Sequence, residues 1–180
     1  KIKTLLKNRK VSKELKYFNS LFFEFQYKYD LNVIFDDLLT IIICAMGRGT
    51  QEPLYFETIK KYSRAELDIF CKLFGELLII YEKNISAGDW CDPLGEYYEC
   101  LAGNYKKSSF GQFFTPKVIC NFMSAVLLDS DEWGKTINEP TCGSGRMVLA
   151  ANHKAKGNYY VCEDLDPICC KMTAINLCLH

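Results

Sequence analysis

The sequence predicts an α+β or α/β protein, in which a helical amino-terminal region over residues 1–103 precedes the first half of a doubly wound domain over residues 104–180. Apolar residues recur at helical spacing through most of the first region. From Lys135 onward the pattern changes to strand, turn, helix, strand, turn and helix, which is typical of the opening of a doubly wound sheet. Apolar residues make up 49% of the chain, so the composition favours a packed core over disorder.

Apolar patterning and capping signals indicate four helices in the amino-terminal region, and these span residues 13–29, 31–46, 63–83 and 92–101. Ser63 and Glu66 have the spacing of a capping box, in which each side chain binds the other residue's backbone amide at a helix start. Asp92 followed by Pro93 supplies an N-cap and a proline in the first turn. Two of the four helix starts are therefore marked by local signals as well as by periodicity.

The carboxy-terminal half is expected to alternate between strands and helices. Residues 104–115 are expected to form a loop or linker, and Thr115-Pro116 to cap a helix that ends near Leu128. The elements expected after it are strands over 135–139 and 159–163 and helices over 145–153 and 167–179. Because two strands alone leave unpaired edges, the other strands are expected from a longer parent chain or from another chain. The uncovered apolar surface is expected to cause self-association.

The formal net charge is zero, with 22 basic and 22 acidic residues, so the chain as a whole shows no electrostatic preference for nucleic acid. The charge is uneven, however, because cations are concentrated at the amino terminus. These cations are Lys1, Lys3, Lys7, Arg9, Lys10, Lys13 and Lys16. A solvated helix face and a phosphate-contacting arm are both compatible with this cluster.

The chain has ten cysteines, none of them in a C-x-x-C pair, so the spacing typical of a zinc site is absent. Several lie inside apolar runs, where cysteine behaves as a small buried hydrophobe. We expect reduced thiols in an intracellular, cytoplasmic protein. No signal peptide is recognisable, and the most apolar run, residues 38–46, is too short to cross a bilayer.

A glycine turn, Gly143-Ser144-Gly145, stands between an expected strand and an expected helix. Glycine permits a positive φ and a close approach of the backbone to a ligand, and the start of a helix presents free amide groups. Asp164 lies nineteen residues after Gly145, at the end of the next strand, where an acid can bind ribose hydroxyls. This spacing indicates a nucleoside site, with a purely structural glycine turn as the alternative.

Other glycine-rich motifs fit this turn poorly. A dinucleotide fingerprint needs glycine or alanine where Val148 stands, and the chain contains no Walker loop. The serine elbow of hydrolases needs a glycine where Cys142 stands. The type of nucleoside must therefore be inferred from the residues that flank the turn.

Three segments resemble, in the same order, motifs of the N6-adenine DNA methylase family. They are FGQFFTP at residues 110–116, EPTCGSGRM at 139–147, and EDLDP at 163–167 with the CCKMTAINLCLH segment at 169–180. That family includes the modification subunits of type I restriction-modification systems. The resemblance implies that residues 104–180 begin a Rossmann-like, S-adenosyl-L-methionine-dependent methyltransferase domain, of which this sequence holds only the amino-terminal part.

The resemblance implies a site for S-adenosyl-L-methionine and no metal. The loop that carries FFTP would fold over the methionine part of the cofactor, and Glu139 would lie beside its ammonium group. Main-chain groups of the glycine turn would contact the cofactor, and Asp164 would bind its ribose. The cofactor-binding residues expected on this basis are Phe113, Phe114, Thr115, Glu139, Pro140, Thr141, Cys142, Gly143, Ser144, Gly145 and Asp164.

Some of these assignments have structural alternatives. Phe113 and Phe114 could instead pack in a core, and Glu139 could be a surface acid at the end of a strand. Glu163 is the alternative to Asp164 as the ribose-binding acid, although the two side chains would point to opposite sides if the strand continued.

Two further charged residues lie at expected helix starts. Asp166 precedes Pro167 and suits a helix N-cap. Arg146 lies in a first helical turn, where its charge opposes the helix dipole. We therefore expect Arg146 to have a partner, which the sequence does not identify.

The catalytic motif of the family, [ND]-P-P-[YFW], is absent, because the chain contains no Pro-Pro pair. In amino methyltransferases this motif binds the target amino group and stacks on the flipped base. No catalytic residue is therefore predicted here. The chain is expected to position the methyl donor without supplying the site of the acceptor.

The resemblance predicts the cofactor-binding portion of a DNA adenine-N6 methyltransferase from a bacterial or phage-encoded restriction-modification system. Expected partners are DNA, through the complete enzyme, specificity or restriction subunits, and a second copy of the chain; no membrane is expected. The alternative is a non-catalytic helical interaction module with a degenerate nucleotide pocket. Methylation of another substrate, such as protein glutamine, is a third hypothesis, which the FGQFFTP segment disfavours.

Overall fold

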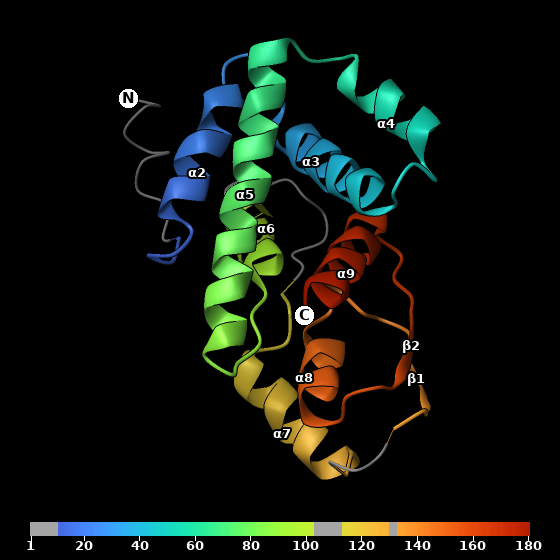
Figure 1. Cartoon of the computed structure of the whole chain (residues 1–180). Helices are drawn as coiled ribbons and strands as arrows, with labels where there is room; N and C mark the ends of the chain where they lie inside the picture. The colour runs from blue at the N-terminus through green and yellow to red at the C-terminus, as the bar shows by residue number, and fades with distance from the viewer. Residues whose placement is uncertain (1–10, 103–112, 130–132) are drawn as a thin grey trace.

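A computed structural model describes residues 11–102, 113–129 and 133–180. Most of the cationic cluster, and the expected loop up to residue 112 with the Phe-Gly-Gln start of FGQFFTP, lie outside these residues. The amino-terminal region is helical, as predicted (Figure 1). Its elements are α2 Lys16–Phe22, the 3₁₀ helix η1 Phe23–Phe25, α3 Leu31–Met46, α4 Glu52–Ile59, α5 Arg64–Ser86 and α6 Pro93–Ala102.

Local capping signals set two of these helix starts. The Ser63 side chain accepts the Glu66 amide at 3.4 Å, and Glu66 Oε2 accepts the Ser63 amide at 2.7 Å, which confirms the capping box of α5. Asp92 Oδ1 accepts the Gly95 amide at 2.8 Å and caps α6, as its place before Pro93 predicted.

Helix α4 was missed by the sequence prediction. Only Thr58 of its eight residues is buried, whereas Leu54 and Phe56 are exposed. A helix that buries one residue carries no periodic apolar stripe, so apolar spacing does not predict it.

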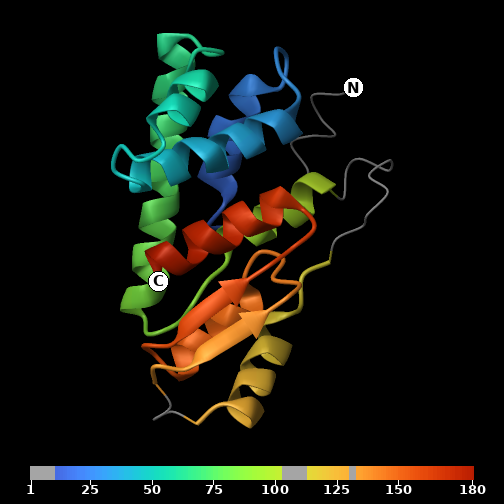
Figure 2. The same ribbon diagram turned by 90° about the vertical axis from the view of Figure 1, so that its right-hand side faces the viewer.

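The core of the helical region is aromatic and extends into the carboxy-terminal half. The ring of Tyr97 meets Phe18 and Phe22 edge to face, with centroids 4.8 and 5.1 Å apart. Met172 and Ile175 of α9 Pro167–Leu179 belong to the same buried cluster. Both views show α9 between the amino-terminal helices and the strands (Figures 1 and 2). One core thus spans both sides of residue 103, and the domain boundary there stays a prediction.

The remaining elements follow the predicted order closely. They are α7 Lys117–Leu127, β1 Thr136–Glu139, α8 Arg146–Lys154, β2 Tyr159–Cys162 and α9. Asp166 Oδ1 accepts the Ile168 amide at 2.9 Å and caps α9, as predicted. The prediction that Thr115 caps α7 was wrong, because Pro116, with φ −58° and ψ 141°, takes the N-cap position and no side chain caps the helix.

Strands β1 and β2 pair in parallel, with Thr136 opposite Tyr159 and Glu139 opposite Cys162. They form a two-stranded sheet, and α8 lies behind it in Figure 2. The side chains of the opposite face are exposed; they are Thr136, Asn138, Tyr159 and Val161. The described residues thus contain the parallel β-α-β opening of the predicted fold within a mostly helical structure, while the Rossmann-like domain as a whole stays a prediction.

None of the helices among the described residues is both long enough and hydrophobic enough to cross a bilayer.

The exposed apolar surface predicts self-association. Val118, Phe122 and Val126 recur every fourth residue along α7, and all three are exposed. We expect the sedimentation coefficient of this chain to rise with protein concentration, and Phe122→Lys to weaken that rise. Ile79→Lys on α5 is the matched control, because Phe122 and Ile79 are each 63% exposed. A monomer at every concentration would contradict the prediction.

Candidate functional site

The glycine turn joins β1 to α8 and adopts conformations that favour glycine. Gly143 has φ +55° and Gly145 has φ +92°. A Cβ at Gly143 would lie 2.9 Å from a ring carbon of Phe114, so the turn also needs glycine for space. The Thr173 hydroxyl donates to the Gly143 carbonyl at 3.0 Å, which fixes the turn against α9.

Asp164 faces this turn directly. Its Oδ2 accepts the Gly143 amide at 2.9 Å, and its Oδ1 accepts the Asp166 amide at 2.9 Å. Glu163 is exposed, and its backbone continues the pairing with β1 through a 2.9 Å bond from its amide to the Glu139 carbonyl. The backbone carbonyl of Glu163 accepts the Cys142 amide at 2.8 Å, but of the two acids considered for the ribose only Asp164 brings its carboxylate to the turn.

A cavity of about 340 Å³ opens beside the turn. Its lining includes eight of the eleven predicted site residues, which are Phe113, Phe114, Thr115, Thr141, Cys142, Gly143, Ser144 and Asp164. Arg146, Met147 and Cys169 complete the lining; the sequence had marked only Arg146, as a charge without a known partner. This volume lies near the lower end of the roughly 300–1,000 Å³ typical of small-molecule sites.

Three predicted residues lie outside the lining. Glu139 ends β1, and its Oε1 accepts the Thr141 amide and hydroxyl, both at 3.1 Å. Pro140 and Gly145 shape the turn without facing the cavity. The ammonium-binding role expected of Glu139 therefore stays a prediction.

Phe113 and Phe114 have different environments. Phe113 is 91% exposed at the cavity, which is inconsistent with the core-packing alternative. The Phe114 ring stacks on Tyr98, with centroids 6.0 Å apart and an interplanar angle of 29°, and it also lines the cavity. Phe114 thus packs against a neighbouring ring and also lines the cavity, so both alternatives considered from the sequence apply to it.

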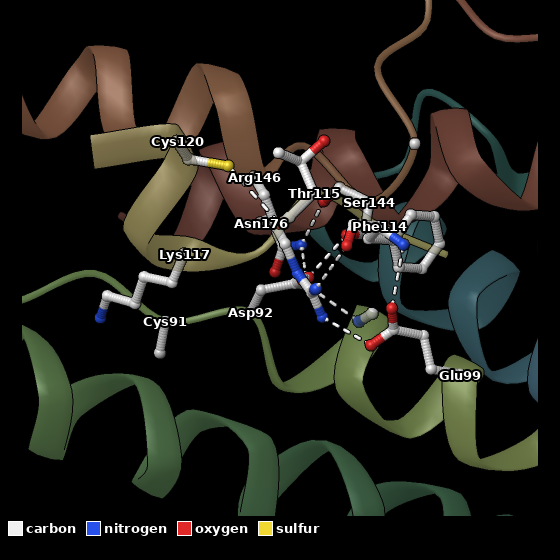
Figure 3. Close-up of polar contacts among 12 residues, drawn as sticks. Cys91, Asp92, Glu99, Phe114, Thr115, Lys117, Cys120, Ser144, Arg146 and Asn176 are labelled. Atoms are coloured by element: carbon white, nitrogen blue, oxygen red, sulfur yellow. Dashed lines mark hydrogen bonds and ion pairs between the residues drawn. The ribbon is translucent and has the colours of Figure 1, made fainter. Parts of the chain in front are cut away.

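A buried carboxylate connects the turn to the helical region. Asp92 Oδ1 accepts the Gly95 amide and the Asn176 side-chain amide, both at 2.8 Å. Its Oδ2 accepts the Ser144 hydroxyl at 2.5 Å and Arg146 Nε at 2.7 Å (Figure 3). Four donors therefore surround this one carboxylate, and a full set of donors is the condition under which a buried carboxylate is tolerated.

Gly95 makes the close contact between Ser144 and Asp92 possible. A Cβ at Gly95 would overlap the Asp92 carboxylate and the Ser144 hydroxyl, and it would lie 2.6 Å from the Ser144 Cβ. Sequence patterns do not reveal this constraint, because Ser144 lies 49 positions after Gly95 along the chain.

Asn176 carries the hydrogen-bond network into the deepest core. Its side-chain amide also donates to the Ser144 carbonyl at 2.6 Å, and its Oδ1 accepts the Tyr81 hydroxyl. Both Asn176 and Tyr81 are buried, and burial raises the pKa of Tyr81 well above its usual value. The network therefore joins α5, α6 and α9 to the glycine turn.

Arg146 is paired with acidic side chains, as expected for a cation in the first turn of a helix. Besides Asp92, its Nη2 lies 3.0 Å from Glu99 Oε2, and its Nη1 donates to the Phe114 carbonyl at 3.3 Å. Two carboxylates outweigh the unfavourable helix dipole. Burial acts to lower the pKa of Arg146, but Asp92 and Glu99 more than offset this, so the pKa is raised. Burial raises the pKa of Asp92, with Arg146 opposing that rise.

The described residues contain no cluster of histidine, cysteine and acidic side chains that could hold a metal ion. None of the ten cysteines, all of which lie in the described residues, forms a disulfide. The residues that line the cavity carry a carboxylate, a guanidinium, hydroxyls, thiols and two phenyl rings.

Comparison with known proteins identifies the family of this chain. The model of the N-6 DNA methylase family matches residues 90–180, which include the glycine turn and Asp164. This chain belongs to the N-6 DNA methylase family. The family match also includes Asp92, Glu99, Arg146 and Asn176, so the buried network lies within the matched segment of this methylase-family chain.

One solved structure is similar to the whole of this methylase-family chain. It is the methyltransferase subunit of a type I restriction-modification system from Streptococcus thermophilus, with 20% sequence identity and a TM-score of 0.43. The match covers 100% of this chain and 44% of that one. The chain therefore spans less than half the length of that subunit.

The buried network predicts a large stability loss for Asp92→Asn. The substitution would place an amide among four donors and leave Arg146 without its buried partner. We expect the free energy of unfolding in urea to fall by about 3–5 kcal/mol. Asp89→Asn is the matched control, because Asp89 pairs with Lys117 at 2.7 Å while its side chain is 52% exposed, against 4% for Asp92. That control should lose less than about 1 kcal/mol. Equal losses in the two variants would show that the network adds no stability.

His180 predicts a pH dependence of stability. Its Nε2 accepts the Cys91 amide at 3.1 Å, so Nδ1 carries the proton that is donated to the Asn176 carbonyl at 2.7 Å. Burial lowers the pKa of His180 below its ordinary 6.5, so the unfolded chain binds a proton before the folded chain does. Stability contributed by neutral His180 is therefore present above about pH 6.5 and is lost as the pH falls through the folded-state pKa.

Urea midpoints measured between about pH 8 and about pH 5 should show this loss. His180→Gln should reduce the pH dependence, and His153→Gln, at the other histidine of the chain, should retain it. The same pH dependence in all three proteins would exclude His180 as its source.

Proposed function

We propose that the cavity beside the glycine turn binds S-adenosyl-L-methionine. The observation that carries this proposal is the Asp164 carboxylate, which faces the Gly143 amide beside a cavity at the carboxyl ends of two parallel strands. Ligands of open α/β sheets bind outside the carboxyl ends of the strands. Membership of the N-6 DNA methylase family supports a methyl donor over other nucleosides.

The groups around the cavity fit a nucleoside with a charged amino acid part. Each Asp164 oxygen accepts one backbone amide, and a carboxylate oxygen has a second lone pair that can accept a ribose hydroxyl. The first turn of α8 directs backbone amides toward its amino-terminal end. Phe114 and Thr115 would contact the methionine part from the opposite side.

The bound cofactor would supply a methyl group on a sulfonium centre. The residues of this chain would bind and orient that donor and shield it on the Phe114 side. Without a Pro-Pro pair, the chain offers no residues of the family's acceptor motif. Transfer to the exocyclic amine of adenine, and contact with DNA, specificity subunits or restriction subunits, are proposed for the complete enzyme, as a bacterial or phage-encoded cytoplasmic protein.

Calorimetric titration with S-adenosyl-L-methionine tests the proposal. Asp164→Asn keeps the size of the side chain but removes its charge. We expect its affinity to fall about tenfold or more, because hydrogen bonds to a charged group contribute about 1.5–3 kcal/mol. Glu163→Gln is the matched control, since this neighbouring acid is exposed and lies outside the cavity.

Three outcomes can be told apart. Weaker binding only in Asp164→Asn would support the proposed site. Equal binding in all three proteins would place the cofactor elsewhere. No binding by the unaltered chain would favour the alternative function, a helical interaction module with a degenerate pocket.

A further inference from the structure

The backbone of Phe114 is held from both sides. Its amide donates to Glu99 Oε1 at 2.9 Å, and its carbonyl accepts Arg146 Nη1 at 3.3 Å. Glu99 Oε2 and Arg146 Nη2 lie 3.0 Å apart, so the three residues form a closed ring of interactions (Figure 3). We call this ring the Phe114 clamp.

The clamp joins three separate parts of the fold. Glu99 belongs to α6, Arg146 is the first residue of α8 directly after the glycine turn, and Phe114 precedes α7. Phe114 and Arg146 also line the cavity. The position of the Phe113–Thr115 segment at the cavity is therefore tied to an ion pair between the helical region and the glycine turn.

The ion pair of the clamp is held in a fixed geometry. The Arg146 and Glu99 side chains are only 14% and 28% exposed, so water screens the pair less than a surface pair. Arg146 Nε is bound to Asp92, which orients the planar guanidinium toward Glu99 and Phe114. The guanidinium carbon also lies 5.4 Å from the centre of the Phe114 ring. Few other orientations satisfy all of these contacts.

We propose that Glu99 and Arg146 are positioning residues that hold the Phe113–Thr115 segment against the cavity and thereby set the affinity for the methyl donor. This inference rests on the proposed function. A cofactor that contacts Phe114 only when the segment is docked binds with an affinity reduced by the docked fraction. By reciprocity, the bound cofactor stabilises the docked segment.

Hydrogen–deuterium exchange measures the docking without any ligand. In Glu99→Gln the ion pair is lost, and the Phe114 amide faces a weaker, uncharged acceptor. We expect exchange of the peptide containing Phe114 to become about tenfold faster, while peptides from α5 keep their rates. Asp36→Asn is the matched control, because Asp36 pairs with Lys171 at 2.5 Å, away from the cavity. Unchanged exchange in Glu99→Gln would overturn the proposal.

Titration with S-adenosyl-L-methionine measures the consequence for binding. We expect Glu99→Gln to bind about tenfold more weakly than the unaltered chain, and saturating cofactor to restore slow exchange at Phe114. A purely structural role of Glu99 would not produce this restoration. Faster exchange with unchanged affinity would overturn the positioning role.

The two measurements separate this inference from the proposed function. If the unaltered chain binds no cofactor, the proposed function fails for this chain, and the coupling fails with it. The exchange measurement would still show whether Glu99 and Arg146 hold the segment in place.

Discussion

The site depends on one buried carboxylate. Asp92 is removed from water and is stabilised there by donors from its own helix, from the glycine turn, from α8 and from α9. Burying a charge is unfavourable unless hydrogen bonds replace those of water, so these four contacts must form together. Because the donors belong to different elements, satisfying Asp92 also fixes the glycine turn relative to the helical region. Two of these donors, Ser144 and Arg146, also line the cavity.

The helical region consequently helps to shape the candidate site. The β-α-β unit supplies the turn and Asp164, whereas the Phe114 side of the cavity is held by Glu99 on α6. The aromatic core continues from the amino-terminal helices into α9, whose Thr173 and Asn176 support the turn. Packing within the helices and the geometry at the cavity are thus linked through α9 and α6.

The sheet has one covered and one exposed face. Parallel sheets are normally covered on both faces, because their crossover connections place helices there. Tyr159 and Val161 are apolar side chains on the exposed face of β2. The exposed face of this sheet therefore lacks, within the described residues, the cover that parallel sheets normally have.

The sequence by itself determined the features that depend on neighbouring residues. The caps at Ser63, Asp92 and Asp166 and the positive φ of the glycine turn require only residues a few positions apart, so their signals are local. Only the tertiary structure decided that Asp92, besides capping α6, accepts Arg146 from 54 positions away, and that Glu99 holds both Arg146 and Phe114. Contacts between residues that are distant in the sequence leave no periodic pattern in it. The partners of Arg146, which are Asp92 and Glu99, could therefore be identified only from the folded structure.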